Sequence, residues 1–201
     1  MARVKLSDDL KHAISGLPSK EKDKLLFRLI AKDEALVEKL IFELLERDVS
    51  PKDRRETLME EIDHHLDQYK NYYYSPGYLL LELRSISGII TRHVKTTKDK
   101  YGDIQLNFFM LNKSLALFGE RIQQARPQKQ RTLSDYVIKR AVKLLKQLSK
   151  MHPDLRLDFE QDMMLLGKHI SKNRLMVELA PSHGLNLSNL LEGHLGRNFN
   201  I

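Results

Sequence analysis

Apolar residues recur at intervals of three and four positions along most of this chain. Within residues 33–47, for example, Leu36, Leu40 and Leu44 follow one another at four-residue steps. That spacing places side chains on one face of an α-helix. No segment alternates apolar and polar residues as a half-buried strand does. The pattern therefore predicts an all-α protein.

Several helix boundaries are marked by capping residues. Ser50-Pro51 and Ser75-Pro76 each pair a capping serine with a proline that suits the first helical position. Residues 126–131 form a polar, basic stretch that we expect to be a hinge. The expected helices cover residues 7–16, 19–30, 33–47, 51–74, 76–97, 103–125, 134–151, 153–170 and 174–179.

The lengths of these segments suggest one domain over residues 1–180. Short helices occupy residues 7–47 and longer ones residues 51–179, joined by connections short enough to make neighbours antiparallel. Two architectures satisfy this pattern: a stack of helical hairpins of the HEAT/armadillo type, or an up-down helix bundle. Residues 181–201 are rich in glycine and asparagine, and we expect a loosely ordered tail there.

Composition narrows the cellular setting. The chain has no cysteine, and its first residues contain no apolar stretch typical of a secretion signal. No apolar run approaches the ~20 residues needed to span a bilayer. The sequence therefore predicts a cytoplasmic protein with no membrane partner.

Positive charge is concentrated in one part of the chain. Residues 92–150 hold 14 Lys/Arg against 4 Asp/Glu, although the net charge of the whole protein is only +7. A stripe of lysines recurs at helical spacing there, formed by Lys139, Lys143, Lys146 and Lys150. Such a stripe is a candidate site for phosphates or nucleic acid. No recognised nucleic-acid-binding motif accompanies it, and a solvated helix face is the alternative.

A pair of acidic motifs lies on two consecutive predicted helices. Glu43 and Glu46 form an ExxE motif, and Glu60 and Asp63 form an ExxD motif. This arrangement resembles the metal-binding signature of the all-α NTP pyrophosphohydrolases, which include MazG-type enzymes and dimeric dUTPases. The resemblance implies that the four carboxylates hold Mg²⁺, which binds a triphosphate and activates water. All four residues lie off the apolar faces of their helices, so solvated surface is the alternative.

The same helix carries a second polar group. Glu60, Asp63, His64 and Asp67 share one face, where they could bind a divalent ion or form a plain solvated surface. We expect the neighbouring His65 to be partly buried and hydrogen-bonded.

Tyrosines gather around the Ser75-Pro76 turn. Tyr72, Tyr74 and Tyr78 are candidates for binding a protein partner, because tyrosine offers a large, rigid contact area. The alternative is a semi-buried corner in which Tyr69 and Tyr73 belong to the core.

No phosphate-binding loop, dinucleotide fingerprint, zinc-protease motif or nucleophile elbow is present. As a whole the chain resembles the small all-helical protein families of bacteria. The leading hypothesis is a non-enzymatic helical module that binds a protein partner and needs no cofactor. The alternatives are a Mg²⁺-dependent NTP pyrophosphohydrolase and nucleic-acid or phosphate binding through the basic helix.

Overall fold

The computed structural model of the protein describes residues 5–46 and 50–195, and these form α-helices without any β-strand. The all-α prediction is therefore confirmed. The predicted end of a helix at residue 47, and residues 196–201 of the expected tail, lie outside the described residues. No helix in the described part of the chain combines the length and apolar character needed to cross a membrane.

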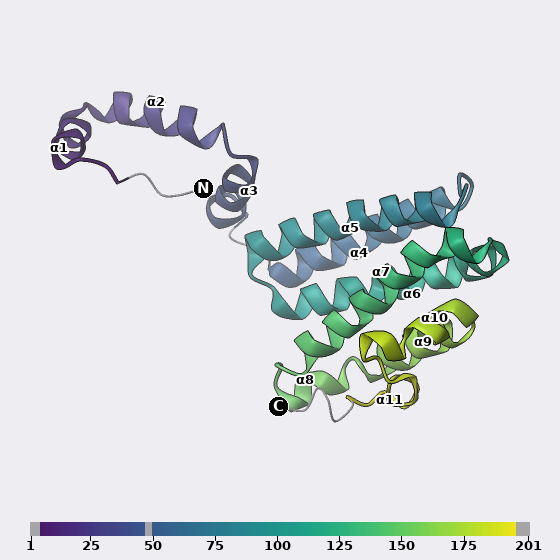
Figure 1. The fold of residues 1–201 in the computed structure, drawn as a ribbon. Helices are drawn as coiled ribbons and strands as arrows, with labels where there is room; N and C mark the ends of the chain where they lie inside the picture. The colour runs from purple at the N-terminus through teal and green to yellow at the C-terminus, as the bar shows by residue number, and fades with distance from the viewer. Residues whose placement is uncertain (1–4, 47–49, 196–201) are drawn as a thin grey trace. The chain divides into compact units, whose positions relative to one another are not determined.

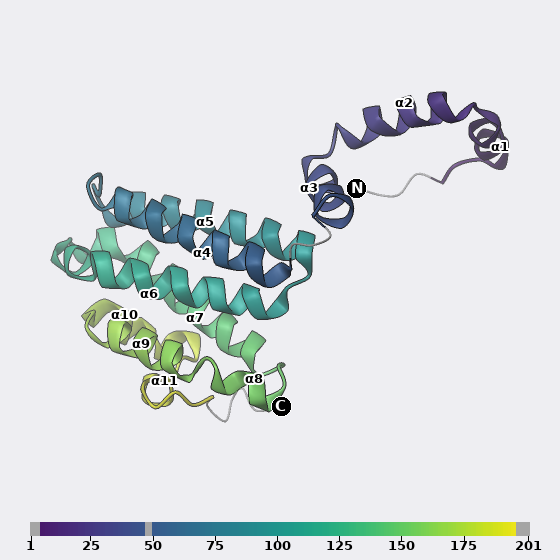
Figure 2. The same cartoon turned by 180° about the vertical axis from the view of Figure 1, so that it is seen from behind.

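The chain divides into two compact units, residues 1–48 and 49–201, where the sequence suggested one domain over 1–180. The first unit contains α1 (Asp8–Gly16), α2 (Ser19–Ile30) and α3 (Glu34–Leu44). Within it, α1 and α3 lie at opposite ends of α2 (Figures 1 and 2). None of the residues of these three helices is buried, so the unit has no core of its own.

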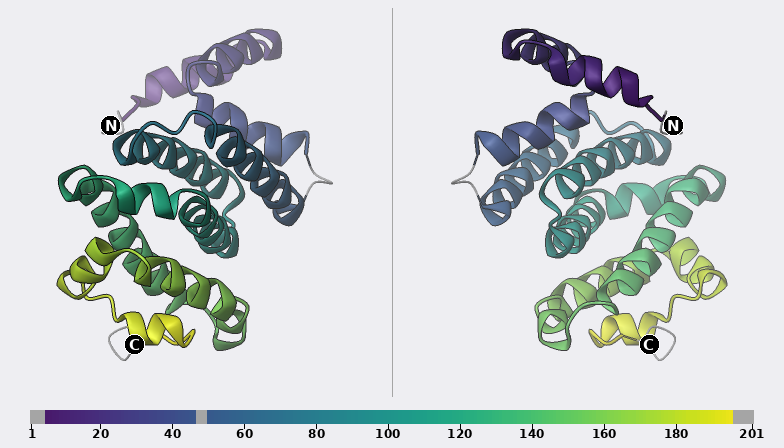
Figure 3. Two further views of the ribbon diagram at one scale, coloured as in Figure 1. Left: turned by 90° about the vertical axis from the view of Figure 1, so that its right-hand side faces the viewer. Right: turned by 90° about the vertical axis from the view of Figure 1, so that its left-hand side faces the viewer.

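The second unit is built around one central helix. Its long helices are α4 (Pro51–Tyr69), α5 (Pro76–Thr97), α6 (Lys100–Gln124) and α7 (Pro127–Leu148). The shorter elements are α8 (Pro153–Leu157), α9 (Glu160–Ser171), α10 (Arg174–Leu179), the 3₁₀ helix η1 (Pro181–His183) and α11 (Leu187–Leu191). The helix α6 packs against α4, α5, α7 and α9 (Figure 1). Among the green to yellow segments at the C-terminal end, α9 packs against α6, α10 against α7 and α9, and α11 against α9 (Figure 3).

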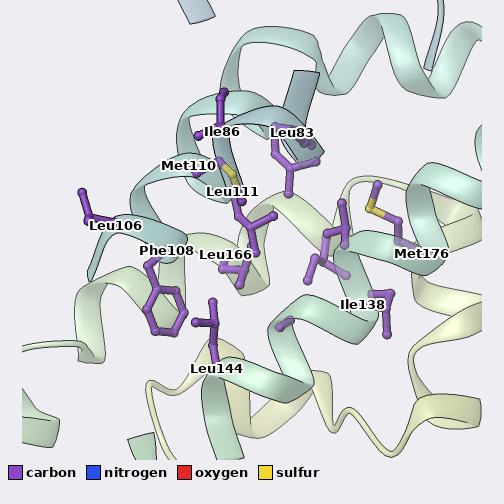
Figure 4. Packing of buried hydrophobic residues seen from close by; sticks show 14 of the residues in the cluster. Leu83, Ile86, Leu106, Phe108, Met110, Leu111, Ile138, Leu144, Leu166 and Met176 are labelled. Carbon is purple, nitrogen blue, oxygen red and sulfur yellow. The ribbon is translucent and has the colours of Figure 1, made fainter. Parts of the chain in front are cut away.

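The core is formed where these helices meet. Leu83 and Ile86 of α5, Leu111 of α6, Leu144 of α7 and Leu166 of α9 pack together (Figure 4). Each is 2% exposed or less. Burial on this scale is the main favourable contribution to folding. The hairpin stack and the up-down bundle both stay predictions.

Several boundaries differ from the sequence prediction for identifiable reasons. The helix α6 begins at Lys100 and not at residue 103, because Asp99 is its cap: the Asp99 carboxylate accepts the backbone N–H of Gly102 at 2.8 Å. The expected hinge at 126–131 is helical, since α7 begins at Pro127. There the Gln130 side-chain amide donates to the backbone carbonyl oxygens of Gln123 and Ala125, which supplies hydrogen-bond donors to carbonyls at the C-terminal end of α6.

The C-terminal segment also departs from expectation. The predicted helix over 153–170 is interrupted at Phe159, which is 1% exposed and packs on Tyr101 and Phe108. In the described part of the expected loose tail, residues 181–195, Leu185 and Leu190 are buried. The apolar side chains between its glycines therefore attach this segment to α9 and α7.

Candidate functional site

The tyrosine-rich corner between α4 and α5 separates into a partly buried and an exposed set. Tyr69 and Tyr73 pack on Phe118 of α6, with ring centroids 5.7 and 5.2 Å away. Tyr72, Tyr74 and Tyr78 are instead 78%, 80% and 56% exposed. Tyr69 and Tyr73 thus belong to the packed side of the corner, and partner binding by the exposed Tyr72, Tyr74 and Tyr78 stays a prediction.

The partly buried tyrosines and an arginine anchor the corner. The Arg121 guanidinium of α6 donates to the backbone oxygen of Lys70 at 2.9 Å and lies 5.5 Å over the Tyr73 ring. Burial, with a smaller contribution from Tyr69, raises the pKa of Tyr73 to about 12. The contacts made by Phe118 and Arg121 hold the end of α4 and the following turn on α6. The exposed tyrosines therefore project from a fixed base.

The exposed aromatic surface continues along α5. Tyr74 and Tyr78 meet edge to face at 5.4 Å, and Leu81, one turn further on, is 56% exposed. Ser85 and Ile89 follow at helical spacing and are also exposed. We call Tyr72, Tyr74, Tyr78, Leu81 and Ile89 the α5 face. It runs for roughly 16 Å along the helix between Tyr78 and Ile89.

The sequence analysis did not single out Leu81, although a signal was present. Leu79, Leu80 and Leu81 are consecutive, and at 100° per residue three adjacent helical positions cannot all face one core. Leu79 and Leu80 are buried and Leu81 is not. The third leucine of the run thus belongs to the surface.

The four carboxylates of the predicted Mg²⁺ site are divided between the two units. Glu43 and Glu46 belong to the first unit and Glu60 and Asp63 to the second. The Glu43 side chain is 49% exposed and lies 3.5 Å from the Lys39 amine. Neither unit by itself contains more than two of the four, so the Mg²⁺ site stays a prediction.

The polar face of α4 is engaged by a lysine from α6. The Lys113 amine lies 2.7 Å from the Asp63 carboxylate and 3.2 Å from that of Asp67. Hydrogen bonding to Asp63 raises the pKa of Lys113, which keeps the amine charged. A bound cation would compete with this amine for both carboxylates. No group of three or more His, Asp or Glu in the described ranges is arranged to hold a metal ion.

The histidines of α4 form hydrogen bonds along the helix surface. The His64 ring nitrogen pairs with the Gln68 amide at 2.7 Å, and the His65 ring with the Glu82 carboxylate of α5 at 2.9 Å. His65 is thus hydrogen-bonded as expected, and half of its side chain is exposed.

The lysine stripe of α7 lies on the solvent side of that helix. Lys139, Lys143, Lys146 and Lys150 are all exposed, and the opposite face, which includes Val137 and Leu144, is fully buried. Lys139 is paired with Asp135 at 2.6 Å. Anion binding by this stripe stays a prediction. It would weaken steeply with added salt, so an affinity that is insensitive to salt would contradict it.

A buried charged cluster that sequence reasoning missed joins α4, α5 and α6. Asp99 pairs with Arg55 at 2.9 Å, and the His93 ring nitrogen lies 3.7 Å from the same carboxylate. Burial lowers the pKa of His93 and outweighs the opposing effect of Asp99. Because Asp99 is also the cap of α6, we interpret this cluster as a structural joint between helices.

Comparison with known proteins gives no match: no family model, no curated protein and no solved structure is similar to this chain. The functional argument therefore depends on the geometry described above.

Proposed function

We propose that this protein is a non-enzymatic helical module that acts in the cytoplasm and binds a protein partner through the α5 face. The observation that carries the proposal is the exposure of three tyrosines and Leu81 on a corner anchored by Phe118 and Arg121. Aromatic residues that protrude from a rigid base are typical anchors of protein interfaces.

The energetic reason is that this face is already ordered before binding. Binding costs about 0.5–1.5 kcal/mol for each flexible side chain that must be immobilised. Tyrosine has few rotatable bonds, and Tyr74 and Tyr78 already restrain one another. The α5 face therefore loses little conformational entropy when a partner covers it.

A capture experiment with a matched control tests the proposal. The triple variant Y72A/Y74A/Y78A should fold normally but lose the protein that the wild type captures from a cell extract. The control is L155A/L157A, which removes two exposed apolar side chains from α8 of the same unit. Capture that is equal for all three proteins would exclude the α5 face.

A further inference from the structure

The first unit exposes an apolar surface that its own residues do not cover. Leu26 and Phe27 of α2 and Leu44 of α3 are each more than half exposed, and no residue of α1–α3 is buried. The first unit spans only 48 residues, and domains of this size are marginally stable even with a core of their own. Because the helices of this unit bury no residue, a second surface that covers their apolar side chains would stabilise it.

A shallow groove runs along α2 from Leu17, in the connection after α1, to Arg28. It has a volume of about 340 Å³, and its lining residues are Leu17, Glu21, Lys24, Leu25 and Arg28. The two leucines form an apolar floor, and Lys24 and Arg28 give the groove a mainly basic rim. Such a groove fits an amphipathic helix that carries apolar side chains beside acidic ones.

The helix α3 has that character. Residues 33–46 hold five Asp/Glu against one Lys, whereas residues 19–32 hold five Lys/Arg against two Asp/Glu. Glu38 and Glu43 flank the apolar side of α3, on which Leu36, Ile41 and Leu44 are exposed. The groove and α3 are thus complementary both in charge and in apolar character.

The α3 of one chain does not occupy the groove of the same chain. None of the residues that line the groove belongs to α3. The helix α3 instead leaves from the far end of α2 after a connection of three residues (Figure 1). The complementary surfaces on one copy therefore point to a second copy.

We propose that two copies of the chain associate about a two-fold axis, with α3 of each copy in the α2 groove of the other. A two-fold arrangement fills both grooves at once and leaves neither groove open for a third copy. This inference is independent of the α5 face, which lies in the other unit.

Sedimentation equilibrium of the full chain tests the proposal. We expect a monomer–dimer equilibrium in which the dimer predominates at about 100 μM chain. A monomer at that concentration, or an open series of larger assemblies, would overturn the proposal. A monomer is the expected result if residues 50–195 of the same chain cover this surface.

Charge reversal then tests the pairing itself. K24E/R28E places acidic side chains on the groove rim opposite an acidic α3, and E38K/E43K places lysines on α3 opposite a basic groove. Each variant alone should weaken self-association by at least about tenfold, because like charges then face each other at both contacts. The control K129E/R131E makes the same change of charge at exposed positions of α7 and should dimerise like the wild type.

Mixing the two variants distinguishes the proposed pairing from loss of folding. In a mixed dimer, the acidic groove of one variant receives the basic α3 of the other. The second contact pairs an unaltered groove with an unaltered α3. The mixture should therefore recover wild-type dimerisation that neither variant shows alone. Failure of the mixture to associate, when both variants have wild-type helix content, would overturn the proposal.

Discussion

Replacing two neighbouring tyrosines at the α4–α5 corner should change the free energy of unfolding by very different amounts. In Y73A the lost ring is stacked on Phe118, with centroids 5.2 Å apart and planes 14° apart, and lies edge-on to Tyr69. Deleting a core aromatic ring costs about 3–5 kcal/mol. Tyr73 is only partly buried, so we expect the free energy of unfolding to fall by about 2–3 kcal/mol and Tm by about 5–10 °C.

The exposed neighbour should behave differently. Tyr74 is 80% exposed, so Y74A should change the free energy of unfolding by no more than about 0.5 kcal/mol. Y73F is the matched control, because the Tyr73 hydroxyl is buried without a hydrogen-bond partner among the described residues. Its removal should therefore be neutral or slightly stabilising.

Urea unfolding followed by tyrosine fluorescence is the assay. All seven tyrosines lie between residues 69 and 136 and the chain has no tryptophan, so the signal reports on the second unit alone. The reasoning is refuted if Y73A costs less than about 0.5 kcal/mol, or if Y74A costs as much as Y73A.

Three further outcomes follow from the structure. Burial lowers the pKa values of His93 and His169, so the unfolded state binds protons first and stability should fall as pH drops from about 6.5 toward 5. H93Q/H169Q should flatten that slope in urea titrations, and an unchanged slope would contradict this cause. In G167A the new methyl group would lie 3.1 Å from the Leu191 backbone nitrogen, which should cost about 1–3 kcal/mol by urea unfolding. In G119A the new methyl group would have no neighbouring atom within 4 Å, so this variant should not be destabilised. Equal losses of unfolding free energy in G119A and G167A would exclude crowding as the cause of the G167A effect. The hydrolase prediction requires Mg²⁺-dependent release of pyrophosphate from a nucleoside triphosphate. It fails if E60Q releases as much as the wild type.

The sequence was most informative where a local interaction determines the structure. Ser50 forms a capping box with Asp53, whose carboxylate accepts the Ser50 backbone N–H at 3.0 Å, and α4 begins at the predicted residue. Opposite the lysine stripe of α7, the buried residues Val137, Ala141 and Leu144 likewise follow one another at the three- and four-residue spacing of a helical face. In both cases the relevant partners lie within a few residues of one another.

Prediction failed where the determining contact is distant in sequence. Asp99, which caps α6, is paired with Arg55, 44 residues earlier in the chain. Phe159 interrupts a helix, and its ring packs on those of Phe108 and Tyr101. The tyrosine cluster was recognised from composition, but its division depends on Phe118, which lies on another helix. The helical periodicity of α4 and α5 does not show which of their tyrosines α6 will cover.

Photo-crosslinking from the α5 face tests the central claim most directly. A photoreactive phenylalanine at position 81, inside the face, should form a covalent adduct with a partner protein. The same group at Leu155, which is also exposed but lies on α8, should form none. Adducts only from position 81, suppressed by Y74A/Y78A in the same chain, are the result that the account predicts. No adduct from position 81, or the same adducts from both positions, would contradict it.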